Sequence, residues 1–383
     1  MRELYFVIPF CIFLPCFAKV EFLLAVWRHG DRSPENLPYP SDPYNETFWH
    51  RGWNQLTNVG IEQSVKLGTF LRRRYKDSVL PKFDRKKIFF RTSDADRAIE
   101  TAQAVAMSIF PPTEKQSWNN GKYRYWQPIP IRTNPKGEDP MLRPSKINCP
   151  NYNRLVDEEK TDIENDINWK YREELQLISH QINHTTNYSN IKDVYNILLE
   201  HYNGLPFPDW ILQVINGRPL LDTIAEIRRI SRLQKFDSRE KSKYMAGIII
   251  SNWTESLIEA ANKKSQKRAL LYSSHDGTVS SLLYGLNVSN HQLVPYTACV
   301  MLELHTGNIV KLFLRNTTSE DPSDVHQLLI PGCPEECPLR TFTDLVADVC
   351  IKSMDELNKI CNFSFYRSTF VSTLILIFYF CLL

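Results

Sequence analysis

The chain has 383 residues, of which 43% are hydrophobic and 12% aromatic, so it can bury a substantial core and is too long for one minimal domain. Its 46 basic and 43 acidic residues leave a formal net charge of +3. This balance gives no reason to expect a nucleic acid or an acidic membrane surface as a partner, and we predict no nucleic-acid partner.

Both ends of the chain carry apolar segments that predict targeting rather than folded structure. Residues 1–18 combine an early arginine, an apolar run over Leu4–Phe17 and a final small residue, which is typical of a secretory signal peptide; the alternative is a first buried strand or helix. Residues 363–383 end in the uncharged run Phe370–Leu383, which predicts a C-terminal membrane anchor, with the removable tail of a lipid-anchor signal as the alternative. The rest of the chain would then be extracellular or lumenal.

Cysteines and glycosylation sequons agree with the secretory pathway. Outside the end segments the cysteine count is even, which predicts disulfides and leaves fifteen connectivities open for Cys149, Cys299, Cys333, Cys337, Cys350 and Cys361. The close pair Cys333 and Cys337 favours a small local disulfide over a metal site, because no second Cys or His pair lies at ligand spacing, and we predict no metal. Sequons predict glycosylation at Asn45, Asn183, Asn187, Asn252, Asn287, Asn316 and Asn362.

Three segments repeat one pattern, a short apolar run followed by a polar cluster and a helix-like stretch. The apolar runs are Phe22–Trp27, Lys87–Phe90 and Ala269–Tyr272. They predict strands of an open α/β sheet, in which ligands bind at the carboxyl ends of the strands, where each polar cluster falls. Apolar spacing also predicts a helix over Thr57–Lys76, and alternation over Val300–Leu304 and Ile309–Leu314 predicts an antiparallel hairpin at the sheet edge.

The order of these segments predicts an α/β fold, with a mixed, mostly parallel sheet flanked by helices and a smaller, mostly helical cap domain. The sheet domain, which would be catalytic, comprises residues 19–117 and 244–362. Between them, residues 118–243 change to proline-rich turns and charged helical stretches. This change predicts a cap inserted into the sheet domain and covering the carboxyl ends of the strands.

The most informative stretch is Arg28-His29-Gly30-Asp31-Arg32-Ser33-Pro34, directly after the first predicted strand. Two guanidinium groups can each bind a phosphate through paired hydrogen bonds, and the imidazole between them can attack phosphorus. The pattern R-H-G-x-R-x-P fixes five residue types within seven positions, which makes a chance match rare. The stretch therefore predicts a phosphate-binding pocket.

The polar clusters after the other two strands complete a candidate catalytic site. We expect His29 to be a neutral nucleophile and Asp276, kept protonated beside an anionic substrate, to donate a proton to the leaving group. The phosphate ligands would be Arg28, Arg32, Arg97 and His275. This set predicts hydrolysis of phosphate monoesters through a phosphohistidine, with an acidic optimum and no cofactor.

Two roles near the second predicted strand need separate comment, the third phosphate-binding arginine and the cap of the following helix. Arg91 is the alternative to Arg97 as the third arginine. Ser93 or Asp94 is expected to cap the helix that follows, in a pattern that resembles a capping box, so neither is expected to act in catalysis.

These segments resemble the histidine acid phosphatases of the animal lysosomal and prostatic type. The resemblance runs from about Val20 to Cys361 and is carried by Arg28 to Pro34, Arg91-Thr92-Ser93-Asp94 with Arg97, Trp126-Gln127-Pro128-Ile129-Pro130, Tyr272-Ser273-Ser274-His275-Asp276, and Pro331-Gly332-Cys333 with Cys337-Pro338-Leu339. It implies a phosphoglycerate-mutase-like fold and acid phosphatase activity without a metal. The implied phosphoryl acceptor is His29, the proton donor is Asp276, and the phosphate ligands are Arg28, Arg32, Arg97 and His275.

The resemblance also implies disulfides, and the chain departs from the family near two of its cysteines. The implied pairs are Cys333 with Cys337 and Cys149 with Cys361. The family partner of Cys299 is absent from the 195–205 region and Cys350 is an extra cysteine, so we pair these two. A further departure is Gly277, which replaces a larger residue after the His-Asp pair and would loosen the leaving-group side of the site.

Three interpretations of function follow. The leading one is a phosphatase of broad specificity for small-molecule or protein phosphate monoesters. A second dedicates the pocket to one ester such as an inositol phosphate, but acidic residues of the predicted cap disfavour a highly anionic substrate; these are Asp157, Glu158, Glu159 and Glu164. A third is a non-enzymatic cell-surface glycoprotein, which the presence of His29 and Asp276 disfavours. The sequence leaves open whether the chain forms a homodimer.

Overall fold

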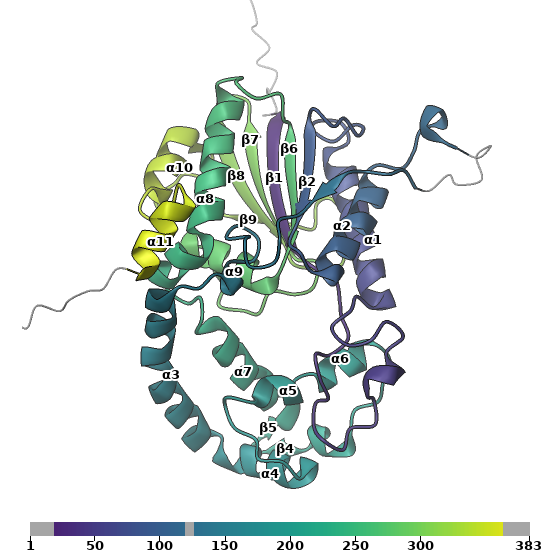
Figure 1. Cartoon of the computed structure of the whole chain (residues 1–383), viewed down its shortest axis with the longest axis vertical. Coiled ribbons are helices and arrows are strands. Elements are labelled where there is room, and N and C mark those ends of the chain that lie inside the picture. Colours follow the sequence, from purple (N-terminus) through teal and green to yellow (C-terminus); the bar gives the residue numbers. More distant parts are fainter. Residues whose placement is uncertain (1–18, 119–125, 363–383) are drawn as a thin grey trace, which may run out of the picture.

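Figure 1 shows a central sheet flanked by helices, with a second group of helices beyond one end of the strands. This computed structural model describes residues 19–118 and 126–362. Within those two ranges no helix has the length and apolar character that crossing a bilayer requires. The predicted signal peptide and C-terminal anchor lie outside the described residues and stay predictions.

The main sheet contains parallel and antiparallel strands. In chain order its members are β1 (Val20–Arg28), β2 (Ile88–Thr92), β3 (Ile131–Arg132), β6 (Ala269–Ser274), β7 (Cys299–His305), β8 (Ile309–Arg315), β9 (His326–Leu328) and β10 (Cys337–Pro338). Their spatial order is β10-β8-β7-β1-β6-β2-β3, and β9 pairs with β8. Strands β1, β6, β2 and β3 pair in parallel, whereas β7 to β10 pair antiparallel. The predicted mixed sheet and its edge hairpin are confirmed.

β1 is buried on both faces, which explains its unbroken apolar sequence. Leu23, Ala25 and Trp27 join the core that includes α1 (Asn58–Tyr75) and α2 (Asp96–Ile109). The alternate residues Phe22 and Leu24 join the core on the opposite face, with α8 (Arg239–Ala261), α9 (Asp276–Gly285) and α10 (Leu339–Val346). The sheet is therefore the middle of three layers, and its strand ends are held rigidly from both sides.

A mostly helical cap lies beyond the carboxyl ends of the parallel strands (Figure 1). It consists of α3 (Pro150–Lys170), α4 (Arg172–Ile182), α5 (Ile191–Val194), α6 (Ile197–Tyr202), η4 (Asp209–Leu212), β4 (Val214–Ile215), β5 (Arg218–Pro219) and α7 (Leu220–Leu233). It has an apolar cluster of its own. The remaining short elements are η1 (Glu46–Phe48), η2 (Glu114–Gln116), η3 (Pro144–Lys146) and α11 (Met354–Asn362).

Two parts of the predicted cap range belong to the sheet layers. β3 pairs with β2, although it lies within residues 118–243. α8 begins at Arg239 and packs against the sheet rather than within the cap. A strand of two residues has no readable periodicity, so the sequence alone could not place β3.

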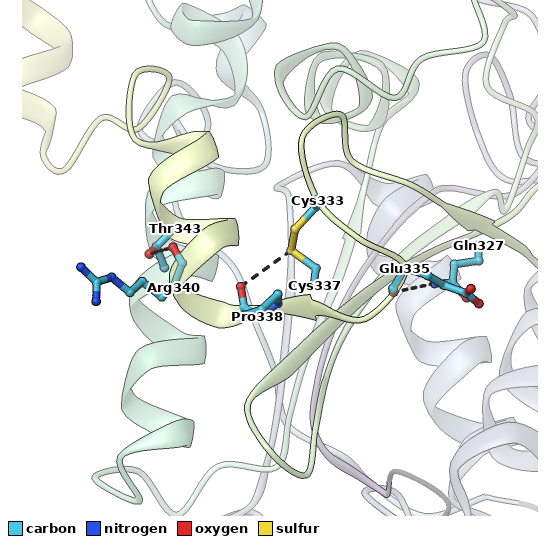
Figure 2. The surroundings of a disulfide bond; sticks show 7 residues. All are labelled: Gln327, Cys333, Glu335, Cys337, Pro338, Arg340 and Thr343. Carbon is cyan, nitrogen blue, oxygen red and sulfur yellow. Dashed lines mark hydrogen bonds between the residues drawn. A yellow bond between two sulfur atoms is a disulfide. The ribbon is translucent and has the colours of Figure 1, made fainter.

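Disulfides join distant parts of the chain and close one short loop. Cys149, directly before α3, is bonded to Cys361 in α11 and so ties the cap to the C-terminal part of the sheet domain. Figure 2 shows the second disulfide, between Cys333 and Cys337, next to Pro338 and the start of α10. Both pairs agree with those that the family resemblance implies.

The predicted pairing of Cys299 with Cys350 is wrong, because both thiols are free. Cys299 lies in the core between the sheet and α1–α2. Cys350 packs against the core on the opposite face. The sheet itself therefore separates the two residues. The seven sequon asparagines are all exposed or half-buried, and their glycosylation stays a prediction.

Candidate active site

The three polar clusters meet because the strands that precede them are neighbours. In the parallel pairing of β1 with β6, Arg28 lies opposite Ser274, and the backbone N–H of His29 donates to the Ser274 carbonyl at 2.9 Å. The N–H of Ser93, directly after β2, donates to the carbonyl of Ser273 on β6 at 3.1 Å. The rings of His29 and His275 consequently lie 5.4 Å apart. The predicted convergence at the carboxyl edge of the sheet is what the structure shows.

His29 is held in one orientation and one tautomer. Its Nδ1 lies 2.8 Å from the Gly30 carbonyl oxygen, which can only accept, so Nδ1 carries the proton. The Nε2 atom keeps its lone pair and accepts a hydrogen bond from Nε of Arg97 at 3.1 Å. Burial, and then the charges of Arg97 and Arg28 together with His275, hold the pKa of His29 well below 6.5. The imidazole is therefore neutral even in acid, with its free nitrogen facing a guanidinium group.

Close backbone contacts fix the loop after β1. A Cβ atom on Gly30 would overlap the backbone of Gly60 in α1, and one on Gly60 would overlap the backbone of Asp31. Asp31 is fully buried, and its carboxylate accepts from Thr57 Oγ1 at 2.6 Å and from Asn203 Nδ2 of the cap at 2.8 Å. Asp31 thus anchors the loop, and the glycines are needed because the loop lies directly on the helix.

Three arginines line the cavity together with His29. Arg28 donates to the Val294 carbonyl at 2.6 Å and stacks over the Tyr296 ring at 3.7 Å. Arg32 donates to the Ser33 carbonyl at 2.8 Å. Burial, followed by repulsion from Arg32 and Arg143, lowers the pKa of Arg97 to about 10. Crowded guanidinium groups of this kind are stabilised by a bound anion.

The structure decides between the two candidate arginines after β2. Arg97 lies in the first turn of α2 and faces His29. Arg91 lies on β2 and is bound to the buried carboxylate of Asp139 at 2.6 Å. Arg97 lines the cavity above His29, and Arg91 does not. Of the two candidates, Arg97 is therefore the one that lies beside His29, which favours it as the third arginine.

The sequence predicts that Ser93 or Asp94 caps the helix after β2, but neither residue is its N-cap. The N-cap residue of α2 is Ala95, and it makes no side-chain capping hydrogen bond. The Ser93 hydroxyl instead lies 2.8 Å from Nε2 of His275. Burial, followed by the charges of Arg97 and Arg143, lowers the pKa of His275 to about 3. Ser93 therefore orients a neutral His275 rather than capping a helix.

Asp276, the first residue of α9, is bound by an arginine that sequence reasoning missed. Arg232, near the end of cap helix α7, donates from Nε to Oδ2 at 2.8 Å and from Nη2 to Oδ1 at 2.9 Å. Although burial opposes ionisation, Arg232 and then Arg28 hold the pKa of Asp276 well below 3.8. In the absence of substrate, Asp276 is therefore a carboxylate and not a protonated acid. No sequence signal separates Arg232 from Arg228 and Arg229, its neighbours in the same helix.

Gly277 does not loosen this side of the site. A Cβ atom at this position would lie 3.0 Å from Nη2 of Arg232 and 3.1 Å from Cζ of Phe236. The space that a larger residue would occupy is thus filled by the cap. The glycine lets Arg232 approach Asp276, which corrects the expectation from the sequence.

A cavity of about 1040 Å³ lies above these residues, between the sheet edge and the cap. All six predicted catalytic and phosphate-binding residues line it: Arg28, His29, Arg32, Arg97, His275 and Asp276. Within the described ranges, no three His, Cys, Asp or Glu side chains are grouped so as to hold a metal ion. The arrangement is a neutral imidazole among guanidinium groups beside a carboxylate, which is suited to binding and transferring a phosphoryl group.

Comparison with known proteins identifies the family. Residues 19–326 match the histidine phosphatase superfamily (branch 2), and the chain belongs to this superfamily. It is 31% identical over 350 residues to prostatic acid phosphatase of Bos taurus, covering 86% of this chain and 85% of the other. It is 32% identical over 346 residues to lysosomal acid phosphatase of Rattus norvegicus, covering 87% and 79%. The predicted family and enzyme class, an acid phosphatase acting on phosphoric monoesters, are confirmed.

Solved structures agree on the fold. The apo form of a Hafnia alvei phytase superimposes with a TM-score of 0.67 at 16% identity, covering 88% of this chain and 98% of that one. A phytase from Citrobacter braakii gives a TM-score of 0.66 at 15% identity, covering 88% and 99%. At this level of identity the likeness supports the fold class alone.

Proposed function

We propose that the chain hydrolyses small-molecule or protein phosphate monoesters in two steps through a phosphohistidine at His29, with Asp276 as proton donor and then base. The observation that carries this proposal is the contact between Nδ1 of His29 and the Gly30 carbonyl oxygen, from which the tautomer of the ring follows. Because Nδ1 donates to the Gly30 carbonyl, the lone pair of Nε2 points into the cavity, where Arg97 and the other guanidinium groups would hold the phosphoryl group.

In the first step Nε2 of His29 attacks phosphorus and the bond to the ester oxygen breaks. The departing alkoxide takes a proton from Asp276. Since Arg232 keeps Asp276 ionised in the free enzyme, the proton enters with the substrate. A phosphate monoester is a monoanion below its second pKa of about 6, and its proton passes to the carboxylate. This requirement gives an acidic optimum.

In the second step water attacks the phosphohistidine and loses a proton to Asp276. The bond from phosphorus to Nε2 breaks, its electron pair returns to His29, and inorganic phosphate leaves. His275 serves as a neutral donor through Nδ1 when the Ser93 hydroxyl donates to its Nε2. Arg28, Arg32 and Arg97 stabilise the transferring group in both steps.

We place the enzyme in the secretory pathway, with its catalytic part lumenal or extracellular. The two disulfides and the similarity to lysosomal and prostatic acid phosphatases support this placement. The membrane anchor rests on the sequence of residues 363–383 alone.

The test compares an aryl phosphate, which has a good leaving group, with an alkyl phosphate, which has a poor one. His29→Ala is expected to abolish turnover of both esters, whereas Asp276→Ala slows the alkyl ester more than the aryl ester. The control is His180→Ala on an exposed position of α4, which should change neither rate. A labelled phosphoenzyme stable to base and labile to acid is expected in the wild type. Equal losses for both leaving groups in Asp276→Ala would exclude it as the acid, and turnover by His29→Ala would exclude the nucleophile.

A further inference from the structure

The cavity above His29 carries far more positive charge than one phosphate group needs. Among the described residues that line it, eleven are arginine or lysine and four are aspartate or glutamate. Two of these acids are already paired, Glu35 with Arg32 and Asp276 with Arg232. Asp157 and Asp193 are the other two. The cavity therefore keeps a large excess of cationic groups.

Four of these cations form a cluster on the cap, away from His29. This cap cation cluster consists of Lys160 on α3, Lys192 on α5, Arg228 on α7 and Lys235 directly after α7. In the part of the chain that the structure describes, no acidic side chain forms an ion pair with any of the four. Cations packed together in a protein are usually compensated by an acid, so this cluster is unusual.

The members of the cluster act on one another and on the phosphate pocket. Burial lowers the pKa of Lys235 first, and the charges of Arg232, Arg228, Lys192 and Lys160 lower it further. Burial also lowers the pKa of Arg228, followed by repulsion from Arg232; the charge of Asp276 opposes this shift, and Arg28 adds to it. These cations thus act on one another across the cavity that they line together. An anion bound among them would relieve the repulsion.

Three of the four acidic residues that seemed to balance the cap face elsewhere. Of the four, Asp157 alone lines the cavity. Glu158 pairs with Arg154 on the exposed side of α3, Glu159 pairs with Lys241 of α8, and Glu164 accepts from the Ser189 hydroxyl. Tyr152, Val156 and Lys160 follow at helical spacing and line the cavity instead. Three of the four acids therefore do not weigh against a highly anionic substrate, although the sequence suggested that they would.

We infer that the cap cation cluster is a second phosphate subsite, so that the preferred substrate is a small molecule with another phosphate group besides the one that is cleaved. The inference rests on the proposed function, because it assigns the cleaved phosphate to the pocket around His29. The cavity of about 1040 Å³ has the size of a small-molecule site. Lysines and an arginine on three separate cap segments can contact the second phosphate from several sides.

The test uses α,ω-alkanediol phosphates with chains of three to eight carbons. Each bisphosphate is compared with the monophosphate of the same diol, so that the leaving group is an alkoxide of the same chain length in both. For at least one chain length we expect the wild type to favour the bisphosphate in kcat/KM by about tenfold or more, beyond the statistical factor of about two. The double variant Arg228→Gln/Lys235→Gln should lose this preference. The measured quantity is a ratio, so a lower yield of folded enzyme cancels.

A matched control is Lys82→Gln/Lys115→Gln, which removes two charges at exposed positions outside the cavity and should keep the preference. The preference should also weaken as salt is added. A bisphosphate ratio no greater than about two at every chain length, or a preference that survives in Arg228→Gln/Lys235→Gln, would overturn the inference. Failure to hydrolyse any monophosphate would instead overturn the proposed function.

Discussion

Glutamine in place of Arg97 should slow turnover far more than glutamine in place of Arg91, although both arginines lie close to the carboxyl end of β2. Nε of Arg97 lies 3.1 Å from Nε2 of His29, the proposed nucleophile, whereas Arg91 is bound to Asp139 outside the cavity. Removing one well-placed donor to a transition state costs ~10²–10³ in kcat, or about 2.7–4 kcal/mol. We expect a loss of this size for Arg97→Gln.

The pH dependence gives a second signature of the same contact. After burial, the charge of Arg97 is the largest cause of the low pKa of His29. Without that charge the imidazole takes up a proton more readily, and a protonated His29 has no lone pair with which to attack. The acid limb of kcat/KM should therefore lie at higher pH in Arg97→Gln than in the wild type.

Steady-state hydrolysis of an aryl phosphate between pH 3 and 8 measures both effects, and Arg91→Gln is the matched control. Its loss leaves the buried carboxylate of Asp139 without a cation, which typically lowers the free energy of unfolding by about 3–5 kcal/mol. Urea unfolding should show that loss while kcat per folded enzyme stays near the wild-type value. A larger loss of kcat in Arg91→Gln than in Arg97→Gln, or an acid limb at the same pH in wild type and Arg97→Gln, would refute the reasoning.

Two further predictions concern carboxyl groups. Arg232→Gln removes both hydrogen bonds to Asp276 and therefore raises the pKa of this carboxyl group. The alkaline limb of kcat for an alkyl phosphate should then lie at higher pH than in the wild type, and an unmoved limb would contradict the coupling. Burial and the neighbouring carboxyl group of Asp42 raise the pKa of Glu200 from 4.5 to about 8. The protonated side chain therefore stabilises the folded state: this contribution is fully present below the unfolded-state pKa of 4.5 and is lost as pH rises through the folded-state pKa of about 8. Tm should fall more between pH 5 and 8 in the wild type than in Glu200→Gln, and equal falls would count against this assignment.

Local sequence predicted most of the elements that position the site. The apolar run ending at Trp27 is readable because β1 is buried on both faces, and the loop after it is readable because few sequences combine these residue types. Parallel strands place their carboxyl ends at one edge, so the meeting of His29 with His275 followed from the strand pattern. Thr57 does cap α1 at the predicted start of that helix.

Contacts between segments far apart in the chain were not predictable in this way. Whether Cys299 could reach Cys350 depended on which face of the sheet each one occupies. Whether the acids of α3 face the cavity depended on the rotation of that helix against α8, where Glu159 meets Lys241. A helical pattern gives the spacing of side chains but not the direction in which the helix turns them.

The sequence by itself determined which groups meet in the proposed phosphate pocket around His29, because Arg28, His29 and Arg32 lie in one short loop of the chain. Only the tertiary structure decided that Arg232 would bind Asp276 and that the cap would turn its cations toward the cavity. The physical reason is that an ion pair between the cap and the sheet layers requires two surfaces from distant parts of the chain to meet, and no local pattern records which residues then face each other.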